Sequence, residues 1–143
     1  MALNHFAKSV MIAGALSLCV GGAAADIVAV VSSKSPVNTL SKDQVADIFL
    51  GKTLRFPGGA EAVPIDQEEG SAARNEFYAA VSGKSPAQLT AHWSKMIFTG
   101  RGLPPKQVAD SIAAKKLVIA NPNAISYIDR SLVDGSVRVV LAP

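Results

Sequence analysis

One stretch, residues 63–78 (VPIDQEEGSAARNEFY), constrains the fold of this chain more than any other. It begins with a short apolar run, passes through an acidic loop to Gly70 and Ser71, and continues as an amphipathic segment. Ser71 is a favourable helix N-cap because its hydroxyl can accept a hydrogen bond from a free amide of the first turn. The stretch therefore predicts a strand over residues 62–65, a turn, and a helix that begins at Ser71.

This helix start is also a candidate anion site. The remaining first-turn amides and the positive end of the helix dipole attract a small anion, and Arg74 lies one turn into the helix, where it can add a positive charge. Most Gly-Ser helix starts only cap a helix, so capping alone is the competing interpretation. Glu68 and Glu69 oppose an anion here unless they pair with Arg74 or face solvent.

Strand-like and helix-like segments alternate along the rest of the chain. Residues 26–32 (DIVAVVS) form a β-branched run without clean alternation, as expected of a strand covered on both faces. Ser41 and Gln44 form a capping box for a helix that stops at Gly51, and Gly83 ends the helix that begins at Ser71. Two further strands are expected at residues 124–129 and 137–141.

A third helix is expected to begin at Ser85-Pro86, where a cap is followed by a proline. Its apolar side chains recur at helical spacing and are interpreted as core: Leu89, Trp93, Met96 and Ile97. Residues 99–105 (TGRGLPP) form a connection, and residues 108–120 are compatible with either a helix or a strand. The pattern predicts one layered α/β domain over residues 26–143, with helices covering a mixed β-sheet.

The first 25 residues have the composition of a secretory signal peptide. They carry a single lysine, an apolar run over residues 9–20, and small residues before a cleavage site after Ala25. This predicts export to the periplasm without a stable membrane anchor. Cys19 is the alternative, as a lipid acceptor, but the bulky Leu18 before it is unfavourable for lipidation.

Other classes of function find little support in the sequence. The basic residues are scattered without interleaved aromatic residues, which argues against nucleic-acid binding. After removal of the signal peptide, His92 is the one remaining histidine and no cysteine remains, so neither a metal site nor a cofactor site is expected. His92 has no nucleophile or acid partner nearby in sequence, and we therefore expect no catalytic residues and no enzymatic activity.

Three motifs resemble the periplasmic phosphate-binding proteins of ABC transporters. They are E-E-G-S-x-x-R-x-x-F at residues 68–77, VADIFLGK at residues 45–52, and AISYI at residues 124–128, in the family's order. The resemblance implies a fold like one lobe of a type II periplasmic binding protein, with a helix up to Asn121. The family usually has R-x-E-G-S-G-T-R, where this chain has Gln67, Ala72 and Ala73 instead of Arg, Gly and Thr, and Ser126 replaces a glycine of the closing strand.

Two hypotheses of function remain open. In the first, the chain binds a small oxyanion, phosphate by resemblance, in ABC-type uptake. Gly70, Ser71 and Ala72 offer backbone amides and Arg74 offers charge. In the second, it is an accessory or sensor module that keeps the fold without tight ligand binding and recognises another envelope protein. A homodimer is a further expectation, because a single lobe lacks the opposing wall that a second chain can supply.

Overall fold

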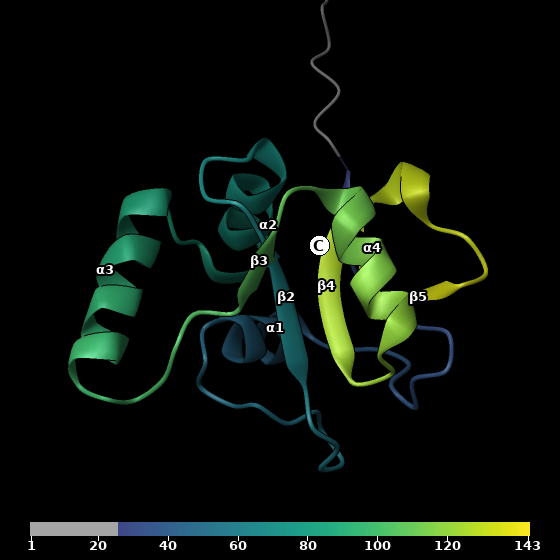
Figure 1. The fold of residues 1–143 in the computed structure, drawn as a ribbon, viewed down its shortest axis with the longest axis horizontal. Coiled ribbons are helices and arrows are strands. Elements are labelled where there is room, and N and C mark those ends of the chain that lie inside the picture. The colour runs from purple at the N-terminus through teal and green to yellow at the C-terminus, as the bar shows by residue number, and fades with distance from the viewer. Residues whose placement is uncertain (1–25) are drawn as a thin grey trace, which may run out of the picture.

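The computed structural model describes residues 26–143, which form five strands and four α-helices around one mixed sheet (Figure 1). The predicted signal peptide, its cleavage after Ala25 and the alternative at Cys19 lie outside the described residues. Within the described part, no helix is long and apolar enough to cross a bilayer. In chain order the elements are β1 (Ile27–Ser32), α1 (Lys42–Phe49), β2 (Val63–Gln67), α2 (Ala72–Ser82), α3 (Pro86–Phe98), β3 (Lys106–Val108), α4 (Ser111–Ala120), β4 (Ala124–Asp129), the 3₁₀-helix η1 (Arg130–Leu132) and β5 (Val137–Leu141).

The strand order of the sheet is β3-β2-β4-β1-β5. β2 runs parallel to both β3 and β4, whereas β1 pairs antiparallel with β4 and β5. This arrangement confirms the predicted α/β class with a mixed sheet. It also places β2, which leads directly into the Gly70-Ser71 turn, between two parallel neighbours.

Helices cover both faces of the sheet, as the unbroken apolar run of β1 predicted. All six residues of β1 are buried. Ala29 and Val31 pack in the cluster that contains α1 and α2, while Val28 and Val30 pack against α4 on the opposite face. Figure 1 shows the same layering, with α4 in front of the sheet and α1 and α2 behind it.

The predicted helix boundaries agree well with the structure because they depend on local capping. Ser41 and Ser85 form capping boxes with Gln44 and Gln88, and Gly83 ends α2 with φ +66°. The ambiguous residues 108–120 contain the helix α4, whose N-cap is Asp110. The short strand β3 was not predicted, and β2 extends two residues beyond the expected strand, as far as Gln67.

The apolar stripe of α3 is only partly core, so the sequence interpretation was wrong for its second half. Leu89 and Trp93 are buried, but Ile97 is 52% exposed and the neighbouring Phe98 is 92% exposed. The reason is the position of α3, which lies beside the sheet rather than across one of its faces (Figure 1). The body of the domain therefore covers one part of the apolar surface of α3 and leaves its C-terminal end open.

The difference in burial along α3 predicts that two truncations on this helix lower the stability of the protein by different amounts. Leu89→Ala should lower the free energy of unfolding by about 2–5 kcal/mol, because it leaves a cavity under α3. Ile97→Ala removes a side chain of the same size from an exposed position and should change stability by about 0.5 kcal/mol or less. Urea unfolding followed by circular dichroism measures both. Equal losses would show that Ile97 is buried in solution.

Candidate functional site

The N-terminus of α2 has the geometry that the sequence predicted. Ser71 is extended, with φ −69° and ψ 142°, and its Oγ accepts a hydrogen bond from the Arg74 amide at 3.2 Å. Gly70 precedes it at φ +86°, a backbone conformation that residues other than glycine rarely adopt. Ser71 is therefore the N-cap, and the chain enters the helix through a turn that requires Gly70.

Some amides of this turn remain available to a ligand. The Ser71 amide donates to the Glu68 carbonyl at 3.2 Å, but the amides of Ala72 and Ala73 donate to no acceptor within residues 26–143. Ala72 is exposed, as are Glu68 and Glu69. The helix start thus offers two free backbone donors, which suit a small oxyanion. The carboxylates of Glu68 and Glu69 oppose an anion here, but both are exposed, where solvent screens their charge.

Arg74 does not extend over these amides. It is 7% exposed, and its Nε lies 3.6 Å from Asp66 Oδ2, while its Cζ lies 5.6 Å from the centre of the Tyr78 ring. The sequence had offered Glu68 and Glu69 as its partners, but the structure pairs Arg74 with Asp66 instead. Much of its charge is therefore already balanced inside the protein.

Asp66 is the centre of this buried polar group. Its carboxylate accepts hydrogen bonds from the hydroxyl of Tyr78 at 2.7 Å and from the hydroxyl of Tyr127. The amide of Gln67 also donates to Asp66 Oδ1 at 2.8 Å. Sequence reasoning missed this cluster, although an aspartate inside the apolar strand 63–67 is a signal that a buried partner is needed.

Both tyrosines of the cluster resist ionisation. Burial raises the pKa of Tyr78 and of Tyr127 far above the ordinary value of 10.0, and the negative charge of Asp66 raises each pKa further. Each hydroxyl therefore remains a hydrogen-bond donor to Asp66 throughout the neutral pH range. The cluster consists of the ion pair between Asp66 and Arg74 and two neutral tyrosine hydroxyls that donate to Asp66. It links β2, β4 and α2.

Gln67 and Ser126, two positions at which the sequence departs from the family pattern, are also directed inward. The side-chain amide of Gln67 donates to the Tyr127 carbonyl at 3.0 Å and to Ser111 Oγ at 3.1 Å. The Ser126 hydroxyl donates to the Ile65 carbonyl at 2.7 Å. Gln67 connects β2 to β4 and α4, and Ser126 connects β4 to β2, so neither offers a donor to a ligand at the α2 N-terminus.

The other sequence candidates do not form a reactive centre. His92 Nε2 lies 2.8 Å from the Leu50 carbonyl, and the His92 ring packs edge-on against Trp93. Among the described residues there is no cluster of three or more His, Cys, Asp or Glu side chains that could hold a metal ion. His92 therefore connects α3 to the end of α1.

Comparison with solved structures identifies the class of fold. A putative phosphate ABC transporter substrate-binding protein from Clostridium perfringens, solved with bound phosphate, is 30% identical with a TM-score of 0.65. An ABC-type phosphate transport receptor from Vibrio cholerae is 20% identical with a TM-score of 0.62, and PstS from Borrelia burgdorferi is 11% identical with a TM-score of 0.60. Each match covers 80% of this chain.

These matches confirm the resemblance predicted from the sequence motifs. This chain spans 44–46% of the length of those three proteins, and it has the fold of one PstS-like lobe of a phosphate ABC transporter substrate-binding protein. The sequence matches no protein-family model and no curated protein. The proteins that it resembles are described as transport proteins that bind substrates, not as enzymes.

The buried ion pair predicts a large effect for a single isosteric change. Asp66→Asn removes the carboxylate charge and leaves the buried Arg74 unpaired, which should cost about 3–5 kcal/mol of stability. Glu68→Gln changes an exposed carboxylate two residues away and should cost about 0.5 kcal/mol or less. Urea unfolding of the single variants and of Asp66→Asn/Arg74→Met measures the coupling, and the double variant should lose less than the sum of its single changes. Additive losses would mean that the pair does not interact.

The raised tyrosine pKa values predict a loss of stability at alkaline pH. Below pH 10 both tyrosines are neutral whether the protein is folded or unfolded, so their contribution is complete. Above pH 10 only the unfolded chain ionises them, and stability should fall by about 1.4 kcal/mol per pH unit for each tyrosine.

Tyr78 and Tyr127 are the two tyrosines of the whole sequence, so the phenolate absorbance reports directly on this cluster. It should appear only together with unfolding, and Tyr78→Phe should roughly halve the dependence of stability on pH in this range. Phenolate absorbance at pH 10 in the folded protein would contradict the buried arrangement.

Proposed function

We propose that this chain is exported to the periplasm, with its signal peptide cleaved after Ala25, and binds a small oxyanion, phosphate, in ABC-type uptake. Of the residues predicted from the sequence, Gly70, Ser71, Ala72 and Arg74, we expect the exposed Ala72 amide to hold the anion together with that of Ala73. The Ser71 amide already donates to Glu68, and Arg74 is paired with Asp66, so Arg74 adds its charge only from within the domain. The observation that carries this proposal is the pair of free amides at the start of α2. The 30% identical structure with bound phosphate supports it.

The same structure argues that such binding is weak. Arg74 is buried against Asp66, Gln67 is hydrogen-bonded within the sheet, and Gly70 and Ala72 at the helix start are exposed to solvent. A charge-assisted hydrogen bond contributes about 1.5–3 kcal/mol, and each 1.4 kcal/mol is a tenfold change in affinity. We therefore expect a dissociation constant for phosphate of roughly millimolar for a single copy of this chain.

A proline at the first position of α2 tests the role of the amides. Ala72→Pro removes one free N–H, and the ψ of 142° at Ser71 is compatible with a following proline. In a titration with inorganic phosphate followed by the amide NMR signals of residues 70–74, this variant should bind about three- to tenfold more weakly. Lys42→Pro places proline at the equivalent position of α1, away from the site, and should leave the affinity unchanged.

One result of this titration would contradict the expected affinity, and another would contradict the proposed function itself. One-to-one binding at micromolar or tighter affinity would contradict the expected weak affinity and show that a single lobe is a complete phosphate site. An absence of phosphate-dependent shifts at residues 70–74 would favour the second candidate function, an accessory or sensor module without tight ligand binding. Its partner would be an envelope protein or a second copy of the chain.

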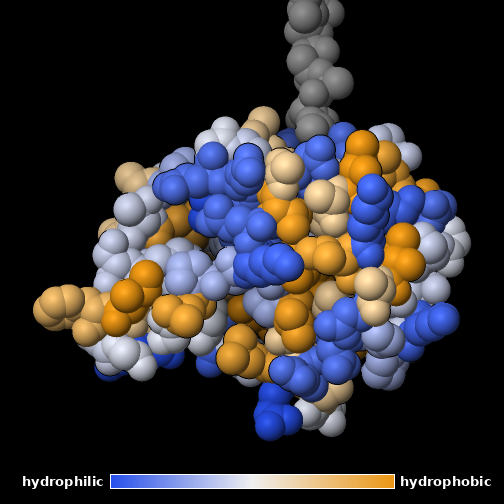
Figure 2. Space-filling view, viewed as in Figure 1, coloured by the Kyte–Doolittle hydropathy of each residue, from blue (hydrophilic) through white to orange (hydrophobic). Residues whose placement is uncertain are grey.

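One observation supports this second candidate independently. Large apolar side chains are exposed at the C-terminal end of α3 and in the connection that follows it, namely Ile97, Phe98 at 92% and Leu103 at 78%. Figure 2 shows apolar surface at this end of the molecule, on its left side. Contiguous exposed apolar surface is typical of protein-interaction sites.

A further inference from the structure

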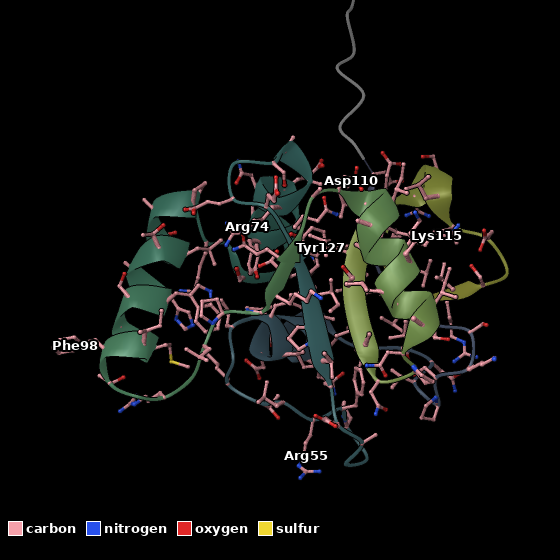
Figure 3. The ribbon with its side chains drawn as sticks, viewed as in Figure 1. Arg55, Arg74, Phe98, Asp110, Lys115 and Tyr127 are labelled. Carbon is pink, nitrogen blue, oxygen red and sulfur yellow. The ribbon has the colours of Figure 1, made fainter. Side chains whose placement is uncertain are left out.

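The C-terminal end of α3 carries a projecting aromatic side chain. Phe98 is 92% exposed, and Figure 3 shows it pointing away from the rest of the domain. Ile97 beside it is 52% exposed, and Leu103, in the connection that follows, is 78% exposed. Three large apolar side chains within one short segment thus lie in solvent, which is typical of a surface that another protein covers.

An apolar groove opens beside this end of α3. It lies between the end of α1, the start of β2 and the connection after α3, and its volume is about 250 Å³. The buried Ile48 and Trp93 contribute to its lining, as do Leu54 at 60% exposed and Leu103. The same region of the chain therefore carries both a projecting apolar side chain and an apolar groove.

One acidic and one basic side chain accompany these two features. Glu61 is exposed, and it is the one charged residue among those that line the groove. Arg101 is exposed in the connection between Phe98 and Leu103. Within residues 26–143 neither side chain takes part in a salt bridge. The groove thus has an available anion, and the projecting segment has an available cation.

We propose that a second copy of this chain covers this surface. The Phe98 ring of each copy enters the groove of the other, and Arg101 of each copy pairs with Glu61 of the other. A second copy suits the surface because one chain carries both halves of each contact, the ring and the groove as well as the cation and the anion. A two-fold axis uses each contact twice and closes the assembly at a dimer.

The size of the surface predicts a weak dimer. A typical stable interface buries about 800 Å² on each partner, and a buried phenylalanine contributes about 150–250 Å². The four exposed side chains Leu54, Ile97, Phe98 and Leu103 therefore supply at most an interface of ordinary size. We expect a dissociation constant of about 10–100 µM.

This inference deepens the second candidate function and rests on the interaction surface named there. It does not involve the start of α2, because the first half of α3 is the part that lies next to the acidic loop, where Thr90 donates to Glu69 at 3.4 Å. Phe98 lies about 12 Å further along the helix. Phe98→Ser should therefore keep the phosphate affinity of the unaltered protein, and Ala72→Pro should keep dimerisation.

Sedimentation velocity of the purified protein from about 5 µM to 1 mM measures the association, and the mass should rise from one chain toward two. Phe98→Ser should weaken dimerisation by about tenfold or more, since it removes the ring from the groove. The matched control is Ile112→Ser, which changes a 56% exposed side chain of α4 outside the groove lining and should keep the affinity.

Charge reversal tests the arrangement of the two copies. Glu61→Arg and Arg101→Glu should each weaken dimerisation about three- to tenfold by placing like charges opposite each other, and the double variant should recover most of this loss. All of these positions are exposed, so the fold should be kept.

Three results would overturn the proposal. They are a protein that stays monomeric up to about 1 mM, a Phe98→Ser variant that associates like the unaltered protein, and a double charge variant that associates no better than the single variants. A monomer that still shows phosphate-dependent shifts at residues 70–74 would refute the dimer and leave the phosphate proposal intact.

Discussion

The carboxylate of Asp66 is the group on which the arrangement of the site depends. It is 1% exposed at the carboxyl end of β2, where an isolated charge would be strongly unfavourable. Hydroxyls from α2 and β4 and the guanidinium of Arg74 compensate its burial. The start of α2 is therefore fixed relative to β2 and β4 by a charged group, in addition to the stacked and edge-on contacts of Phe77 with Tyr127 and Phe49.

This internal ion pair has a direct consequence for ligand recognition. An arginine one turn into a helix can supply charge to an anion at the helix start, but Arg74 is instead paired with the buried Asp66. The free amides of Ala72 and Ala73 remain exposed without it. The helix start thus offers a ligand backbone donors in an open turn, without the support of a side-chain charge.

The apolar C-terminal end of α3 is exposed because other helices already cover both faces of the sheet. The domain spans less than half of the length of the transport proteins that it resembles, and its sheet is covered by α4 on one face and by α1 and α2 on the other. No sheet face remains for α3, which packs through Leu89 and Trp93 beside the sheet. Its remaining apolar side chains, above all Phe98, are left exposed.

The sequence by itself determined the local features of this protein. The helix starts at Ser41, Ser71 and Ser85 and the turn at Gly70 depend on residues within one helical turn, and the order of the motifs was enough to indicate the fold. The tertiary structure alone decided which partner neutralises Arg74, which part of α3 is buried, and that β3 pairs with β2. Asp66 and Tyr127 are 61 positions apart, and periodicity and capping carry no information about contacts at that separation. Such contacts are selected only when the sheet forms and every buried charge must find a partner.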